Sequence, residues 1–313
     1  MAGNASNTKR WLQEFGIEWL SKNSFQLGGY DFSIPTGFVD FLVGNDIKTG
    51  GHAFYLAKNS DIIRRYLTYI NEKRPRDIVE LGIFRGGSTA FLQLAAKPDK
   101  LLAMELAPDR LGALDQFIED QGLQEQMRIE YGVDQADVAL IRRLTLEHLG
   151  EGRNIDVVFD DASHLLGPTR SSFETLFPRI RPGGSYIVED YACAHILTSE
   201  WLDGTRSDAR PAESVAAGVL RDGLPADNKP LHLLAVEAML ASIVAPGLVR
   251  NVVVDKHWLK IVRGARDFDE PNAFDLRKLA SDHFGLLESS LSSQLAKFLN
   301  QTGKHGDNPQ LAE

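Results

Sequence analysis

The sequence predicts an α/β protein built on a doubly wound, mostly parallel sheet. From residue 77 onward, apolar runs typical of buried strands alternate with helix-compatible segments, and this alternation is typical of parallel sheets. A glycine-rich turn follows the first of these runs. Two later runs are joined by only Asp255, Lys256 and His257, too few residues for a helical crossover. Together these observations favour five parallel strands followed by an antiparallel hairpin at one edge.

The segment before the sheet is expected to be a helical and loop-rich extension covering residues 1–60. Apolar residues recur at helical spacing over Thr8–Ser21, which predicts an amphipathic helix. Gly28–Gly51 mixes glycines and aromatic residues without lasting periodicity, which predicts a connector. The next helical run is Asp61–Glu72.

The core domain is expected to span residues 61–264. The five parallel strands are predicted at Asp77–Leu81, Leu101–Glu105, Met127–Tyr131, Asp156–Asp160 and Ser185–Glu189. The hairpin is predicted at Val249–Val254 and Trp258–Val262. Residues 265–313 are expected to form a C-terminal extension with a helix near Leu286–Leu299 and a mobile polar tail.

Composition and charge exclude several classes of function. The chain has 313 residues with 34 basic and 43 acidic side chains, a net charge of −9 that disfavours binding to nucleic acid or anionic lipid. One cysteine, Cys193, forms neither an internal disulfide nor a multi-thiolate metal site. A polar start, Met1–Arg10, and the lack of long apolar runs predict a cytoplasmic protein with no membrane span. Apolar stripes at Trp11–Leu20 and Leu286–Leu299 suggest a homo-oligomer.

The glycine-rich turn after the first strand predicts a nucleoside-binding site. Gly82 and Gly86 allow the backbone to approach a ligand closely, Ser88 can cap the next helix, and Glu80 precedes the turn. Glu105 ends the second strand, where its carboxylate can accept hydrogen bonds from ribose hydroxyls. These features alone also fit a binding site for NAD. The dinucleotide spacing G-x-G-x-x-G is absent, however, which disfavours pyrophosphate binding.

Acidic residues and a histidine follow the fourth and fifth strands. Asp161, Glu189 and Asp190 can converge on one ion, because the carboxyl ends of neighbouring parallel strands lie close together, and such oxygen ligands suit Mg²⁺. His164 is the candidate general base. Asp160 can contact a cofactor or the substrate, or only order the loop. Taken singly, each of these residues also fits a solvated loop charge or a helix cap.

The turn Glu80-x-Gly82-x-x-x-Gly86 resembles motif I of class I S-adenosylmethionine (SAM)-dependent methyltransferases. The run Arg181–Val188 resembles the turn of that family into strand five, and the resemblance covers roughly Asp61–Gly264. It implies a Rossmann-like catalytic domain that binds SAM. It also implies that Asp134 and Gln135, after the third strand, border the adenine.

The pattern Asp161-x-x-His164 followed by Glu189-Asp190 resembles the metal-dependent sugar O-methyltransferases of antibiotic biosynthesis, the macrocin and mycinamicin group. This resemblance implies Asp161, Glu189 and Asp190 as magnesium ligands, His164 as base, and a small-molecule or glycoside acceptor. Catechol O-methyltransferase has a related arrangement with lysine at the position of His164. The motif also recurs in the family named after cephalosporin hydroxylase, so the acceptor stays open.

Two alternative functions remain open from the sequence. One is a nicotinamide-dependent oxidoreductase on the same sheet, against which the glycine spacing argues. The other is a non-catalytic SAM-binding subunit whose terminal helices recruit a partner. The stretch 191–210 is too long for a tight turn, and a lid over the substrate and a variable surface loop fit it equally well; His195 in this stretch has no assigned role.

Overall fold

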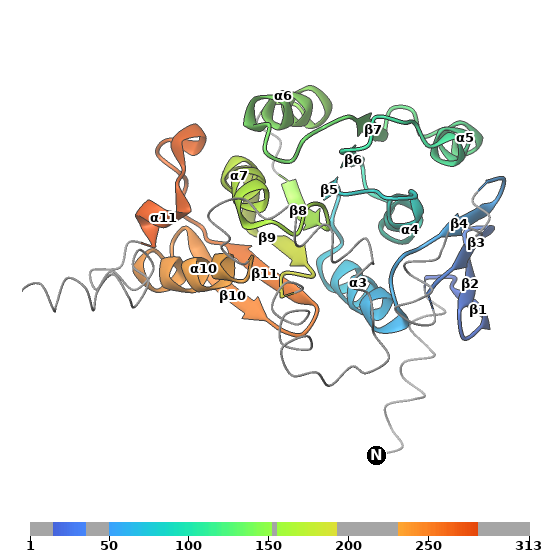
Figure 1. Cartoon of the computed structure of the whole chain (residues 1–313), viewed down its shortest axis with the longest axis horizontal. Coiled ribbons are helices and arrows are strands. Elements are labelled where there is room, and N and C mark those ends of the chain that lie inside the picture. Colours follow the sequence, from blue (N-terminus) through green and yellow to red (C-terminus); the bar gives the residue numbers. More distant parts are fainter. Residues whose placement is uncertain (1–14, 36–49, 152–154, 193–230, 281–313) are drawn as a thin grey trace, which may run out of the picture.

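The computed structural model describes residues 15–35, 50–151, 155–192 and 231–280, and these form a seven-stranded and a four-stranded sheet with flanking helices (Figure 1). Five strands of the larger sheet are parallel, in the spatial order β9-β8-β5-β6-β7. They are β5 (Asp77–Leu81), β6 (Lys100–Glu105), β7 (Met127–Tyr131), β8 (Ile155–Asp160) and β9 (Ile180–Glu189). The predicted α/β class with a doubly wound parallel sheet is confirmed.

The predicted hairpin also lies where it was expected, at one edge of this sheet. Strands β10 (Val249–Val254) and β11 (Trp258–Arg263) are antiparallel to each other, and β11 is antiparallel to β9. The order of strands reverses direction between β5 and β8, so the carboxyl ends of these two strands flank the point where ligands bind in open α/β sheets.

Helices cover both faces of the large sheet (Figure 1). Neighbouring residues of a strand point to opposite faces, so Ile78 and Val79 of β5 belong to different hydrophobic cores. The first face packs against α3 (Ser60–Lys73), α4 (Gly87–Ala96) and α5 (Gly112–Gln121). The second packs against α6 (Val138–Leu149), α7 (Leu166–Leu176), α10 (Leu233–Val244) and the short α11 (Leu276–Leu279). Two 3₁₀ turns, Phe177–Arg179 and Pro271–Ala273, lie in the connections.

The N-terminal segment differs from the prediction. Its strands are β1 (Glu18–Ser21), β2 (Ser24–Leu27), β3 (Tyr30–Ser33) and β4 (Ala53–Tyr55). The predicted helix is therefore wrong over Glu18–Ser21, and the predicted connector is wrong over Tyr30–Ser33. Strand pairing and aromatic contacts outweigh the helical spacing here; the Phe25 ring, for example, stacks on Phe32 at 5.0 Å between centroids.

Some predictions fall outside the described residues. They are the first part of the amphipathic helix, the helix near Leu286–Leu299 and the stretch 193–210 with Cys193 and His195. The division at residues 60/61 and 264/265 stays a prediction.

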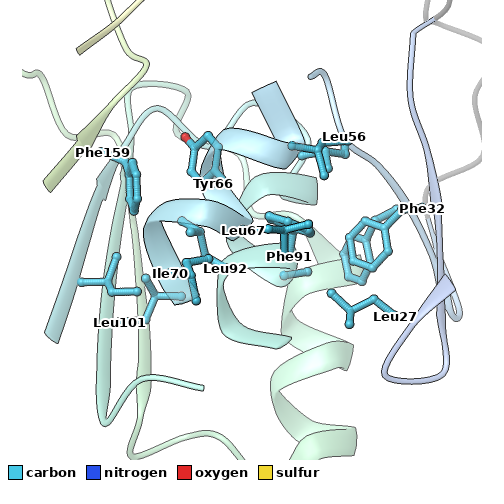
Figure 2. Close-up of a cluster of buried hydrophobic side chains, with 14 of the residues drawn as sticks. Leu27, Phe32, Leu56, Tyr66, Leu67, Ile70, Phe91, Leu92, Leu101 and Phe159 are labelled. Atoms are coloured by element: carbon cyan, nitrogen blue, oxygen red, sulfur yellow. The ribbon is translucent and has the colours of Figure 1, made fainter. Parts of the chain in front are cut away.

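A continuous aromatic core joins the small sheet to the large one (Figure 2). The Phe32 ring of β3 meets Phe91 of α4 edge-on at 6.2 Å, and Phe91 meets Tyr66 of α3 at 6.3 Å. Tyr66 in turn stacks on Phe159 of β8 at 4.6 Å. Residues before position 60 therefore share one hydrophobic core with the parallel sheet, and this packing fixes the start of α3 beside the carboxyl end of β8.

The start of α3 is set by a side-chain cap. Asn59 accepts hydrogen bonds through its Oδ1 from the backbone N–H groups of Asp61 (2.9 Å) and Ile62 (3.0 Å). The cap places the preceding residue, Lys58, at the carboxyl edge of the large sheet. Among the helices that the structure describes, none has the length and apolar character needed to cross a bilayer.

Candidate functional site

A cavity of about 620 Å³ opens at the carboxyl ends of β5, β6, β8 and β9. It lies at the reversal of strand order, where the sequence predicted the site. Eight of the predicted site residues line it: Gly82, Glu105, Asp134, Gln135, Asp161, His164, Glu189 and Asp190. The fold thus brings the glycine-rich turn and the acidic cluster, which are far apart in the sequence, to one cavity.

The glycine-rich turn touches the backbone of the acidic loop directly. Gly82 has φ +85°, and a Cβ atom there would lie 2.3 Å from the carbonyl oxygen of Asp161. Gly86 has φ +81°, precedes the first turn of α4, and leaves room for the Leu114 side chain. Both positions therefore require glycine. Gly86 and Ser88 shape the turn without lining the cavity.

Glu80 and Glu105 are the two carboxylates that support this turn. Glu105 Oε2 accepts hydrogen bonds from the backbone N–H groups of Ile83 and Phe84, both at 2.8 Å, and Oε1 accepts one from Ala107 at 3.0 Å. Burial raises the pKa of Glu80 to about 7, against the opposing effect of a hydrogen bond with Ser88. Glu105 thus holds the turn in shape at the cavity wall, and its contact with a ribose stays a prediction.

Asp160 and Gln135 form a buried network beneath the cavity. Gln135 Nε2 donates to both carboxylate oxygens of Asp160, at 2.7 and 2.6 Å, and Tyr186 donates to Asp160 Oδ2 at 2.5 Å. Ser163 donates its hydroxyl proton to Gln135 Oε1 at 2.7 Å. Burial raises the pKa of Asp160 to about 6. Asp160 does not line the cavity, so its described contacts order the loop, and its predicted contact with the cofactor stays a prediction.

Asp134 has a local structural role and also lines the cavity. Its Oδ1 accepts a hydrogen bond at 2.8 Å from the backbone N–H of Ala136, which closes the turn after β7. The neighbouring cavity wall includes the apolar residues Met104, Leu106 and Val133. An apolar wall beside backbone polar groups suits a nucleoside base.

Asp161, His164 and Asp190 form the cluster that can hold a metal ion. Each offers one ligand atom, and these atoms lie within 4.8 Å of one another. Burial and the nearby Asp161 carboxylate raise the pKa of Asp190. The cluster differs from the predicted set, because His164 stands in the place of Glu189. Two carboxylates and an imidazole suit a divalent cation that keeps some positions for water or substrate.

Backbone strain is concentrated at this cavity. Five non-glycine residues have positive φ among the described residues, and two of them, Arg74 and Lys97, cap helix C-termini. The other three, Phe84 (φ 53°), His164 (φ 54°) and Asp190 (φ 49°), all line the cavity. Non-glycine residues adopt this region at a cost, and such residues cluster at active sites and ligand-binding loops.

Lys58 is the site residue that the sequence did not reveal. Its buried Nζ lies 2.8 Å from Asp161 Oδ2 and 3.0 Å from Glu189 Oε2. Burial by itself lowers the pKa of Lys58, but the charges of Asp161 and Glu189 outweigh it, and the pKa is raised well above its usual value. A single lysine before a helix carries no recognisable motif, and its two partners lie in distant parts of the chain.

Glu189 is directed inward, toward Lys58 and α3. Its Oε1 accepts a hydrogen bond from the Tyr66 hydroxyl, while Oε2 accepts one from Lys58. Burial raises the pKa of Glu189 to about 7, although the Lys58 charge opposes this shift. Glu189 alternates with Val188 and so points to the same face of the sheet as Ile187, the face covered by α3.

Comparison with known families gives the identity of this part of the chain. Residues 79–191, from β5 to just after β9, match the family model described as a methyltransferase domain. Residues 79–191 form a methyltransferase domain. The match includes most of the cavity lining, and the predicted resemblance to SAM-dependent methyltransferases is confirmed over these residues.

The methyltransferase domain is similar to curated O-methyltransferases. Demethylmacrocin O-methyltransferase of Streptomyces fradiae is 37% identical over 98 residues, which is 31% of this chain and 22% of the relative. The 3'-O-methyltransferase of Streptomyces olivaceus that acts on 8-demethyl-8-(2-methoxy-alpha-L-rhamnosyl)-tetracenomycin-C is 31% identical over 153 residues, 46% of this chain and 36% of the relative. Mycinamicin VI 2''-O-methyltransferase of Micromonospora griseorubida is 33% identical over 89 residues, 28% of this chain and 20% of the relative. The matches thus span less than half the length of each.

Among solved structures, the chain is similar to MycE methyltransferase from the mycinamycin biosynthetic pathway in complex with Mg and SAH. The TM-score is 0.42 and the sequence identity 20%, over 65% of this chain and 48% of that one.

Proposed function

We propose that this protein transfers a methyl group from SAM to a hydroxyl group of a sugar, on a natural product or another carbohydrate, with Mg²⁺ and with His164 as general base. The observation that carries the proposal is one cavity, within a methyltransferase domain, that joins the Gly82 turn to the cluster of Asp161, His164 and Asp190. The sugar acceptor is supported by the relative from Streptomyces olivaceus, whose name describes 3'-O-methylation of a rhamnosyl-tetracenomycin-C.

The residues present fit both implied groups. Gly82 lets the turn pack against the Asp161 backbone while it lines the cavity, and Glu105 holds the backbone of that turn. Gly82, Glu105, Asp134 and Gln135 would hold the cofactor along the cavity wall. Asp161 and Asp190 would hold the cation, joined by Glu189 if it is released from Lys58.

When bound, SAM supplies an activated methyl group, and Mg²⁺ lowers the pKa of an acceptor hydroxyl. The protein supplies the base. His164 is partly exposed, with 36% of its side chain accessible, so it can reach an acceptor in the cavity. Its Nε2 takes the hydroxyl proton, and Asp161 Oδ1, 3.9 Å away, stabilises the imidazolium that forms. His164 has a positive φ just before α7, and one of its ring nitrogens lies within 4.8 Å of ligand atoms of Asp161 and Asp190.

The test has two parts that use the full chain. Calorimetric titration with S-adenosylhomocysteine and, separately, with NADH distinguishes a methyltransferase from an oxidoreductase. Methyl transfer is then measured with a panel of glycosylated macrolides and aromatic polyketides, with and without Mg²⁺. Cofactor binding without transfer to any glycoside, together with stable capture of a partner protein, would favour the non-catalytic subunit.

Self-association and a cytoplasmic location belong to the same proposal. Light scattering at micromolar concentration tests the first, and a monomer would contradict it. Localisation of a tagged chain in the producing cell tests the second.

A further inference from the structure

The ammonium group of Lys58 lies where a cation is needed, between two carboxylates of the candidate site. It contacts Asp161 at 2.8 Å and Glu189 at 3.0 Å, and it lies 5.2 Å from the centre of the Tyr66 ring. The side chain is 5% exposed and that of Glu189 is 3% exposed. One positive charge thus links Asp161, a residue of the candidate metal cluster, to the neighbouring carboxylate of Glu189, which is not part of that cluster.

The position of Lys58 is unfavourable in other respects. It lies at the N-terminal end of α3, where the helix dipole disfavours a positive charge, and burial removes the ammonium from water. The two carboxylates must therefore offset both costs. A divalent cation that took Asp161 Oδ2 and Glu189 Oε2 as ligands would compete with Lys58, because these are the oxygen atoms that accept its hydrogen bonds.

We propose that Lys58 is an internal competitor for the divalent cation. In the metal-free protein its ammonium group holds Asp161 and Glu189 together, and a cation that binds these carboxylates displaces it. This inference rests on the metal site of the proposed function. Through its charge, Lys58 would lower the affinity of that site for the metal ion. Glu189 would exchange the ammonium group for the metal ion as its partner.

The test measures metal binding without catalysis. Free Mn²⁺ is followed by electron paramagnetic resonance in titrations of the full chain at about pH 8, where carboxylates are ionised. Lys58→Met keeps the length of the side chain and removes its charge. We expect the Kd for Mn²⁺ to fall by about tenfold or more, because a unit positive charge beside the ion is lost. Added Mn²⁺ should also raise the Tm of Lys58→Met more than that of the wild-type chain.

Two control variants separate charge from other effects. Lys73→Met removes an exposed lysine from the last turn of the same helix, so it gives the same net charge and should leave the Kd for Mn²⁺ unchanged. Tyr66→Phe removes the other partner of Glu189 without a change in charge, and its effect should be smaller than that of Lys58→Met. If Lys58→Met does not fold, Lys58→Gln replaces it, because the amide keeps a hydrogen-bond donor for Glu189.

The outcomes distinguish this inference from the proposed function. If the wild-type chain binds Mn²⁺ and neutral variants at position 58 bind it equally or more weakly, the inference fails and the metal site stands. If Tyr66→Phe lowers the Kd for Mn²⁺ as much as Lys58→Met does, the loss of a hydrogen bond to Glu189, and not the loss of charge, sets the affinity. This result too overturns the inference. If neither the wild-type chain nor the neutral variants bind Mn²⁺, the metal site and the inference fail together.

Discussion

The backbone of Gly82 packs against the carbonyl oxygen of Asp161 so closely that a Cβ atom at position 82 would lie 2.3 Å from it. This contact joins the turn after β5, which supports the cofactor side of the cavity, to the loop after β8, which carries the acidic cluster. The Asp161 N–H also donates to the Leu81 carbonyl oxygen at 2.9 Å. The two halves of the site are thus positioned by backbone contacts, so a change in one should affect the other.

Gly82→Ala should destabilise the protein by at least about 2 kcal/mol, because it combines a positive φ with a backbone overlap. S-adenosylhomocysteine binding should also weaken or disappear. Urea unfolding and calorimetry measure the two effects. Gly112→Ala is the matched control, because Gly112 is exposed at the start of α5 with nothing near its missing Cβ. Equal effects of the two substitutions would contradict the importance of the close contact.

His164→Ala should lower kcat by about 10²–10⁴ while the affinity for S-adenosylhomocysteine stays within about twofold, because a general base acts on the acceptor and not on the cofactor. The measurement needs the acceptor identified by the glycoside panel. His52→Ala serves as the control, since His52 is exposed and its ring packs 5.1 Å from Tyr30, in the small sheet. Unchanged turnover in His164→Ala would remove His164 from the base role.

Asp190→Asn should weaken activation by Mg²⁺ at least about tenfold, because a charged ligand becomes neutral. Asparagine tolerates the positive φ of this position, so the backbone is expected to stay in place. The Mg²⁺ concentration for half-maximal methyl transfer gives the result. Asp109→Asn, at an exposed position before α5, matches the change in charge.

Removal of the metal from the wild-type chain gives an independent test. EDTA should abolish turnover, and added Mg²⁺ should restore it. Activity that persists in EDTA would contradict metal dependence while leaving methyl transfer itself intact.

Glu80 predicts a pH dependence of stability. Burial raises its pKa in the folded protein to about 7, from 4.5. Between these pH values the folded state binds a proton that the unfolded state releases, so this group makes the free energy of unfolding fall as pH rises from about 4.5 to 7. Glu80→Gln should remove this contribution. The free energy of unfolding of Glu80→Gln, relative to that of wild type, should therefore rise by about 2 to 3 kcal/mol between pH 4.5 and pH 8.

Urea unfolding of both proteins at the two pH values measures that difference. Glu125→Gln, at an exposed position before β7, gives the effect of the same substitution without burial. A difference between Glu80→Gln and wild type that does not change with pH would show that the pKa of Glu80 is not raised in the folded protein.

The sequence was sufficient for the large sheet because its parallel strands are apolar runs separated by helices. The strands β5, β7 and β10 begin and end at the predicted residues, and the short link between β10 and β11 required an antiparallel hairpin. The small sheet was not predicted. Its strands have three or four residues each, too few for a clear period, and Trp19 faces Phe25 through pairing that spacing along the chain does not encode.

The sequence predicted the place of the candidate site and eight residues that line its cavity, but neither Lys58 nor the direction of each side chain. Asp160 and Glu189 end their strands as expected, yet both are buried and neither belongs to the cluster of Asp161, His164 and Asp190. Asp160 follows the register of Val158 toward α7, and Glu189 follows that of Ile187 toward α3. Their successors, Asp161 and Asp190, contribute to the cluster instead.

By itself, the sequence determined that the acidic residues and His164 follow strands at the carboxyl edge of the sheet, because the ends of buried runs are local properties that hydrophobic pattern and turn residues encode. Only the tertiary structure decided which helix covers each face, and therefore that Glu189 meets Tyr66 and Lys58 instead of the metal cluster. Lys58 reaches its partners because aromatic packing brings the N-terminal sheet and α3 against β8. Such long-range contacts depend on the packing of the whole core, which no single segment of the chain specifies.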